Sequence, residues 1–186
     1  MRRFDFISTA LDGLTIVHRK PIHDERGFFA RFWCAEEFSS VGWSKQIAQI
    51  NHTLTRRRGV VRGMHFQHPP HAEMKLVTCL RGQVFDVAID LRRDSPTFLK
   101  WHSEVLSAAN LTSLLIPEGF AHGFQTLTND CELLYLHSAP HTQRAEGALN
   151  PTDPYLAIGW PLAIADLSDR DSAHAMLGPE YEGVAR

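Results

Sequence analysis

The sequence predicts an all-β fold, a jelly-roll barrel or sandwich with a few short helices, formed by residues 1–186 as a single domain. Two observations indicate this class. Short segments that alternate apolar and polar residues recur along the chain, and glycine, proline, asparagine or aspartate separates most of them. Many short strands at this spacing are typical of sandwiches and barrels. A chain of 186 residues is also too short for two ordinary domains.

The clearest strand pattern lies between residues 74 and 91. Phe85 and Val87 fall on one face of an extended chain and Asp86 on the other, because successive side chains of a strand point to opposite faces. The Arg-Gly-Gln sequence at 81–83 interrupts this pattern, so we expect a hairpin turn there. The same reasoning predicts further strands at residues 14–17, 28–33, 47–53, 60–67, 100–106, 111–116 and 132–138.

Helical signals are few and short. One covers residues 35–38, and a second begins near Ser168. We expect Ser168 to cap the N-terminus of this second helix, with Asp171 as an acidic residue in its first turn. Stabilisation of the helix N-terminus is enough to explain an aspartate at position 171 without any function. Nothing in the local sequence pairs Asp171 with a histidine.

The composition limits the classes of partner. The formal net charge is −2, so no global basic field favours nucleic acid, and a phosphate-bearing ligand would need a local group of basic residues. Three cysteines without close spacing fit reduced thiols in a cytoplasmic protein better than a disulfide framework. Nowhere do 18 apolar residues follow one another. We therefore expect a cytoplasmic protein with neither a membrane nor a nucleic-acid partner.

Three segments carry polar residues suited to chemistry. Residues 62–67 read Arg-Gly-Met-His-Phe-Gln, residues 73–77 read Glu-Met-Lys-Leu-Val, and residues 117–123 read Pro-Glu-Gly-Phe-Ala-His-Gly. If His65 and Lys75 share a pocket with the histidine of the third segment, a base lies beside a cation. This combination suits the removal of a proton next to a carbonyl group.

The first and second segments differ in how strongly they indicate function. Alternation places His65 with Gly63 and Gln67 on one face of its strand and Arg62 on the other. A single histidine in a strand is more often an ordinary packed or hydrogen-bonded residue than a catalytic one. Lys75 is a stronger signal, because an ammonium group between apolar residues is costly to bury without a partner.

Metal binding is an alternative chemistry for these histidines. Cupin barrels place a His-x-His pair and a glutamate on one strand pair and a last histidine in a Pro-x-Gly-x-x-His motif, which residues 117–122 match. Gln67 stands where the second histidine should be, and Lys75 would repel a metal ion. His68 and His71 lie in a proline-rich turn that we expect to face solvent. We therefore expect no metal and no cofactor.

Three further side chains have both structural and functional interpretations. Tyr135 shares a strand face with Leu133 and His137, which suits a core aromatic residue as well as a catalytic hydroxyl. Arg26 and Arg62 each lie beside a glycine, where the backbone can approach a ligand. Their guanidinium groups could therefore bind phosphate through paired hydrogen bonds.

Taken together, these segments resemble the dTDP-4-dehydrorhamnose 3,5-epimerase family from about residue 13 to residue 171. The resemblance implies a metal-independent homodimer with a cupin-type jelly-roll fold. It also implies a substrate of the nucleotide-diphospho-4-keto-6-deoxyhexose class. The matching segments lie at residues 24–29, 49–51, 59–67, 73–77, 85–92, 95–97, 117–124 and 167–171.

The resemblance further implies roles for individual residues. His65 corresponds to the general base of the family, oriented by Asp171, and Lys75 lies where the family stabilises an enolate. Tyr135 matches the acid on the opposite face of the sugar. A C4 ketone acidifies the hydrogens at C3 and C5, so a base, an acid and a cation are what such an inversion requires. The positions implied to bind the nucleotide diphosphate or the sugar are Arg26, Arg31, Gln49, Asn51, Arg62, His122, Glu146 and Arg170.

Three features differ from the family pattern. Arg31 stands where glutamate is usual, Pro140 and His141 replace an aromatic pair, and an extra residue enters the loop at 147–153. The nucleotide base (dTDP, CDP or GDP) and the choice of C3, C5 or both therefore stay open. The alternatives are a single-centre epimerase acting on a CDP- or GDP-linked 4-keto sugar, a metal-dependent cupin oxygenase and a non-catalytic sugar-binding module.

Overall fold

The computed structural model describes residues 2–185, which form mostly short strands. The strands are β1 (Phe4–Ser8), β2 (Thr15–Arg19), β3 (Ile22–Asp24), β4 (Gly27–Phe29), β5 (Gln49–Thr55), β6 (Val61–Gln67), β7 (Lys75–Arg81), β8 (Gln83–Asp90), β9 (Trp101–Ser107), β10 (Thr112–Ile116), β11 (Phe120–Thr126), β12 (Cys131–His137) and β13 (Glu146–Ala148). The helices are α1 (Ala35–Ser39), the 3₁₀ turn η1 (Gln143–Ala145) and α2 (Asp169–Ser172). None of the helices within residues 2–185 is long and apolar enough to span a bilayer.

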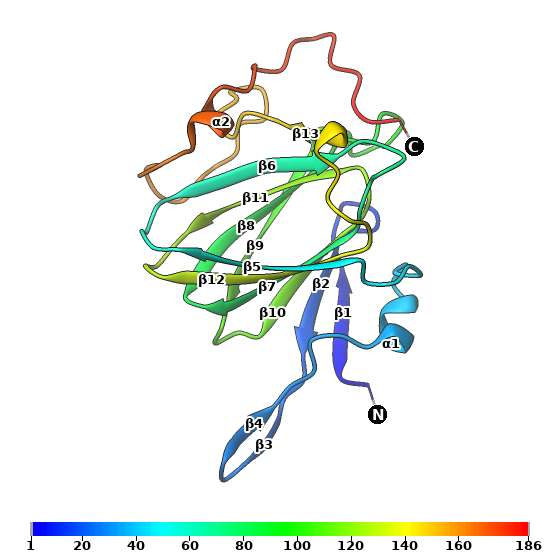
Figure 1. The fold of residues 1–186 in the computed structure, drawn as a ribbon, viewed down its shortest axis with the longest axis vertical. Coiled ribbons are helices and arrows are strands. Elements are labelled where there is room, and N and C mark those ends of the chain that lie inside the picture. The colour runs from blue at the N-terminus through cyan, green and yellow to red at the C-terminus, as the bar shows by residue number, and fades with distance from the viewer. Residues whose placement is uncertain (1, 186) are drawn as a thin grey trace.

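Two antiparallel sheets form the body of the molecule (Figure 1). One sheet has the strand order β1-β2-β10-β7-β12-β5, and the other has the order β13-β6-β11-β8-β9. The hairpin of β3 and β4 forms no part of either sheet and projects away from the body (Figure 1). The predicted all-β jelly-roll sandwich is confirmed.

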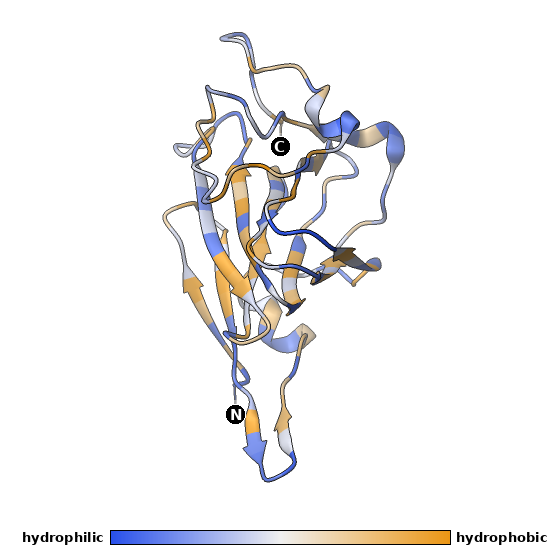
Figure 2. Ribbon diagram, turned by 90° about the vertical axis from the view of Figure 1, so that its left-hand side faces the viewer, coloured by the Kyte–Doolittle hydropathy of each residue, from blue (hydrophilic) through white to orange (hydrophobic). Residues whose placement is uncertain are grey.

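Apolar side chains fill the space between the two sheets. Val77 and Leu133 of the six-stranded sheet belong to one buried cluster with Val84 and Phe124 of the five-stranded sheet. Figure 2 shows the hydrophobic residues distributed along the strands of the body. The outer faces are covered as well, by the region around α1 on one side and by the C-terminal region on the other. Strands β10 and β11 are therefore buried along their whole length, on both faces.

The hairpin expected at residues 81–83 is wrong. β7 ends at Arg81 and β8 begins at Gln83, but β7 pairs with β10 and β12 whereas β8 pairs with β9 and β11. The chain therefore turns a corner from one sheet to the other. Glycine suits this turn for two reasons. The φ angle of Gly82 is +76°, which other residues rarely adopt, and the Cβ atom of any other residue would clash with the Cys131 sulfur at 2.9 Å. Alternation cannot distinguish a corner from a hairpin, because both join two strands through a short turn.

The expected strand at 28–33 is only partly correct, because β4 ends at Phe29 and the chain then runs into α1. Both predicted helices are present. The Ser168 hydroxyl accepts a hydrogen bond from the Asp171 backbone amide at 3.1 Å, which confirms the predicted N-cap of α2. This cap fixes the direction in which the Asp171 side chain leaves the helix, toward β6.

Candidate active site

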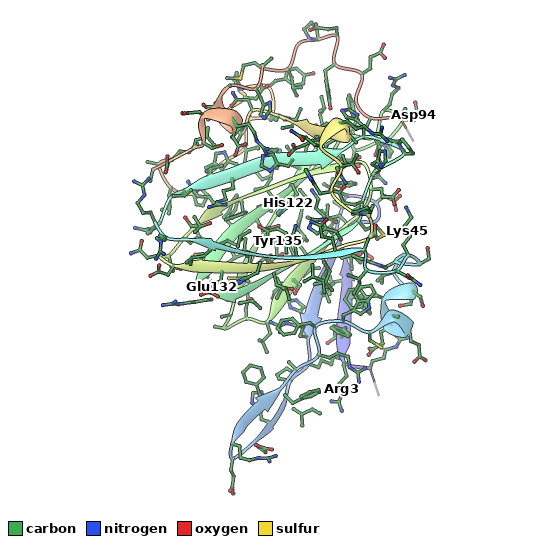
Figure 3. The ribbon with its side chains drawn as sticks, viewed as in Figure 1. Arg3, Lys45, Asp94, His122, Glu132 and Tyr135 are labelled. Carbon is green, nitrogen blue, oxygen red and sulfur yellow. The ribbon has the colours of Figure 1, made fainter. Side chains whose placement is uncertain are left out.

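A cavity of about 270 Å³ opens between the two sheets. Side chains of β5, β7 and β12 line it from one sheet, and side chains of β6 and β11 line it from the other. Figure 3 shows Tyr135 and His122 near each other between the two sheets. The residues that line the cavity are Gln49, Asn51, Thr53, Arg62, His65, Phe66, Gln67, Glu73, Lys75, His122, Phe124, Tyr135, His137, His141 and Glu146.

A bulge in β6 brings Arg62 and His65 to this cavity together. Between these two residues β6 advances three positions, while its partner β11 advances two, from Phe124 to His122. Two residues three apart in a regular strand point to opposite faces, but the extra residue restores them to one face. The expectation that Arg62 faces away from His65 is therefore wrong. Gly63, with φ of +139°, lies where a Cβ atom would come within 2.5 Å of the backbone of β11.

His65 is paired with a buried carboxylate from the far end of the sequence. Its Nε2 atom lies 2.8 Å from Oδ1 of Asp171, whose side chain is only 5% exposed. Burial alone would raise the pKa of Asp171, but the hydrogen bond and charge of His65 outweigh this effect and keep the pKa below its usual value. An ionised carboxylate can only accept hydrogen bonds, so Nε2 carries a hydrogen and Nδ1 is the nitrogen that can take up a proton.

Lys75 lies beside His65, with its ammonium group held by two acceptors. Nζ donates to the His65 carbonyl oxygen at 3.1 Å and lies 3.0 Å from Oε1 of Glu73. Gln67 in turn donates to the other oxygen of Glu73. Two of the three ammonium hydrogens are thus engaged, and the third can serve a ligand in the cavity. The ion pair with Glu73 explains how a lysine is tolerated in this buried strand.

Tyr135 enters the cavity from the sheet opposite to His65. Its ring lies 6.0 Å from the ring of His122 in an edge-on arrangement. Burial raises the pKa of the Tyr135 hydroxyl, so this group stays protonated and can donate a proton or a hydrogen bond. His122 is fixed from behind, because its Nε2 atom contacts both carboxylate oxygens of the fully buried Asp86, at 3.0 and 2.9 Å.

The structure separates the expected substrate-binding residues into two groups. Gln49, Asn51, Arg62, His122 and Glu146 line the cavity. Arg170 lies at its rim, 3.1 Å from Glu146 and 3.2 Å from the His65 ring.

The other two expected binding residues lie away from the cavity of their own chain. Arg26 is on the projecting β3–β4 hairpin, where its side chain is 89% exposed and paired with Asp24. Arg31 lies near α1 and contacts Glu37 at 3.4 Å.

Three residues at or beside the cavity were not among the expected site residues. Asp86 supports His122, Glu73 holds Lys75, and His137 lies beside Tyr135 with a ring distance of 6.1 Å. Alternation along β12 correctly placed His137 on the same face as Tyr135, but nothing in the sequence assigned it a role. Glu73 lies two residues before Lys75 in the same segment, whereas the contact of Asp86 with His122 joins two strands, β8 and β11, that the sequence does not pair.

The side chains that a metal ion would need as ligands already form hydrogen bonds with other residues. His65 is bonded to Asp171 and His122 to Asp86, while Gln67 is bonded to Glu73. Within residues 2–185 no group of three or more His, Cys, Asp or Glu side chains is arranged to hold a metal ion.

Comparison with known proteins identifies the class. Residues 8–178 match the family model described as dTDP-4-dehydrorhamnose 3,5-epimerase. The dTDP-4-dehydrorhamnose 3,5-epimerase of Salmonella typhimurium is 40% identical over 173 residues, covering 92% of this chain and 94% of the relative. The dTDP-4-dehydrorhamnose 3-epimerase of Streptomyces niveus is 38% identical, with coverage of 90% and 81%.

Solved structures agree with this result. The Legionella pneumophila dTDP-6-deoxy-D-glucose-3,5-epimerase in complex with dTDP-4-keto-L-rhamnose superposes with a TM-score of 0.88 at 37% identity, covering 93% of this chain and 92% of the other. The fold and the site thus define an isomerase with a cupin-type jelly roll. The chain belongs to the dTDP-4-dehydrorhamnose 3,5-epimerase family.

Proposed function

We propose that this protein inverts C3, C5 or both in a dTDP-linked 4-keto-6-deoxyhexose, by removing a proton and returning it to the other face through an enolate. One observation carries the proposal. His65, supported by Asp171, and Tyr135 reach one cavity from opposite sheets, and Lys75 lies beside the histidine. A base and an acid on opposite walls are what inversion of a carbon centre requires.

The proposed steps balance as follows. His65 takes the hydrogen next to the C4 ketone as a proton, the electron pair of the C–H bond forms a double bond to C4, and the π electrons of the C4 carbonyl group move to its oxygen. Lys75 stabilises the resulting enolate oxygen. Tyr135 then donates its hydroxyl proton to the carbon from the opposite face while the electrons return from the oxygen. The enzyme is left with an imidazolium and a phenolate, and exchange of protons with water restores both groups.

The polar groups at the mouth of the cavity suit a nucleotide diphosphate. Arg62 and Arg170 supply guanidinium groups close to the His65 end, and Gln49 and Asn51 supply amides on β5. A guanidinium group can bind phosphate oxygens in pairs, which favours these arginines as diphosphate ligands. The base is proposed to be thymine, because the similar proteins are named for dTDP sugars. Inversion of C3 alone is the second candidate, because one similar protein is named as a 3-epimerase.

Hydrogen exchange in deuterated water tests the proposal. The protein, after exhaustive chelation, is incubated with 4-keto-6-deoxyhexoses linked to dTDP, CDP and GDP, and deuterium at C3 and C5 is measured with the product configuration. We expect exchange and inversion with the dTDP sugar. Consumption of oxygen that requires one added divalent ion would favour a cupin oxygenase, and binding without exchange would favour a sugar-binding module.

We further propose that the protein acts as a homodimer in the cytoplasm, with each β3–β4 hairpin covering a second copy. Phe28 and Phe29 are 58% and 64% exposed on this hairpin, and an isolated two-stranded hairpin is marginally stable in water. Arg26 lies at its tip, remote from the cavity of its own chain. Contact with a second copy would cover the two phenylalanines and bring Arg26 toward the partner's cavity. The three cysteines are unpaired, which suits a reducing compartment.

Mixed dimers test this arrangement. Arg26→Ala and His65→Asn are each expected to be weakly active alone. When the two variants are co-expressed, some dimers contain one chain of each. Such a mixed dimer has one site with an intact His65 and an intact Arg26 hairpin from its partner. We expect activity to rise to about a quarter of the wild-type value in a random mixture of dimers. Mixed protein that is no more active than its parents would show that each hairpin serves its own chain, or none.

A further inference from the structure

His137 is a cavity residue to which no role has been given so far. It lies at the end of β12, directly across from Lys75 on β7 and from Gln49 on β5. Directly opposed residues of antiparallel strands point to the same face with their Cβ atoms about 5 Å apart. Its ring is nearly parallel to that of Tyr135, at 20° and 6.1 Å. His137 therefore stands between the cation and the proposed acid.

A chain of hydrogen bonds sets the tautomer of His137. The backbone N–H of His141 donates to Oε1 of Gln49 at 2.9 Å, so the amide nitrogen of Gln49 faces Asn51 and donates to Oδ1 of Asn51, also at 2.9 Å. The Asn51 amide nitrogen is then directed at Nε2 of His137, 3.4 Å away. A backbone N–H can only donate, so each later orientation follows from the first. Nε2 must accept, and the hydrogen of a neutral ring must be on Nδ1.

The ring is also kept neutral. Burial, followed by the positive charges of Lys75, His122 and His141, lowers the pKa of His137 to about 4. These groups approach it from β7, β11 and the loop after β12, while β5 contributes only uncharged amides and Tyr135 is protonated. The Nδ1–H group of His137 has no acceptor within residues 2–185. Nδ1 is also not one of the unpaired nitrogen atoms that are shielded from solvent, so it stays accessible. An open hydrogen-bond donor without charge is thus presented beside Lys75.

We propose that His137 is a further catalytic residue, whose neutral Nδ1–H donates to the C4 oxygen of the enolate beside the Lys75 ammonium. The proposal rests on the function proposed above, because an enolate oxygen is the group that it binds. A neutral donor suits this position, since a second cation would repel Lys75, whereas a fixed dipole strengthens as negative charge develops on the oxygen. A neutral imidazole can polarise a carbonyl in this way.

Three substitutions of His137 separate donation from packing. His137→Asn places an amide N–H near the position of Nδ1, His137→Gln places it near Nε2, and His137→Leu keeps volume without a donor. We expect kcat to fall by about 100-fold in the Leu and Gln variants and by less than about 10-fold in the Asn variant. KM should stay within about threefold, because the bond strengthens only as the enolate forms. His52→Leu on the exposed face of β5 is the matched control and should retain full activity.

Nitrogen NMR of the unliganded protein supplies a measurement that does not depend on turnover. At about pH 6 to about pH 9, His137 should give the signals of a neutral ring with hydrogen on Nδ1, and the His137→Asn spectrum assigns them. Asn51→Asp should move the hydrogen to Nε2, because a carboxylate accepts.

Three results would overturn the inference: an Nε2–H or charged ring in the wild type, equal losses in the Asn and Leu variants, or no loss in His137→Gln. If the wild type exchanges no hydrogen with any of the sugars, the proposed function itself fails. The inference about His137 fails alone when wild-type exchange is intact and the variants behave otherwise than stated.

Discussion

His65→Asn is expected to abolish exchange of the substrate C3 and C5 hydrogens with deuterated water, a loss of about 1,000-fold or more. Asparagine is close to histidine in shape near the backbone, but its amide cannot take up a proton at neutral pH. The Asp171 carboxylate would lose its hydrogen-bond partner at 2.8 Å and gain no basic group in exchange. Deuterium incorporation, followed by NMR at saturating substrate, measures the effect directly.

A matched control is available three residues further along the chain. His68→Asn changes an exposed histidine just beyond the end of β6, outside the cavity lining, and should leave exchange unchanged. Equal melting temperatures of the two variants would show that the fold is retained. Wild-type exchange rates in His65→Asn would remove His65 from the role of base.

Tyr135→Phe is expected to lower formation of inverted product by about 100-fold or more, while exchange that depends on His65 continues. The ring still fills its place between His122 and His137, so the main change is the loss of the hydroxyl. Without a donor on that wall, the enolate can be reprotonated only from the face that His65 occupies. The product then carries deuterium but keeps its starting configuration, which NMR distinguishes from the inverted sugar.

The pH dependence of the wild type follows from the same hydroxyl. Burial raises the pKa of Tyr135, and the acid acts in its protonated form, so no loss of inversion through this group is expected as pH rises to about 9.

Tyr155→Phe, at a 65% exposed position, is the control for Tyr135→Phe. Inverted product at the wild-type rate in Tyr135→Phe would point to another acid. His141, 3.9 Å from Glu146, and water would be examined next.

Local patterns were sufficient to predict much of the fold and some of the site. Period-two alternation identified β6, β10 and β12 nearly to their ends, because every second residue of a strand faces the apolar core between the sheets. The serine before α2 predicted its cap for a similarly local reason, since the hydroxyl satisfies an amide three residues away. Lys75 stood out because an ammonium group among apolar neighbours requires a partner.

Only the tertiary structure decided which of these groups meet. Asp171 lies 106 positions from His65 in sequence, and their contact depends on where α2 is placed against β6. Arg62 joins His65 only because β6 carries a bulge that its own sequence does not reveal, since the extra residue is defined by the register with β11. The turn at 81–83 leads into a different sheet because pairing partners far along the chain compete for each strand. Alternation determines the face of a residue within its strand, whereas register and sheet order, which depend on the whole chain, determine its neighbours.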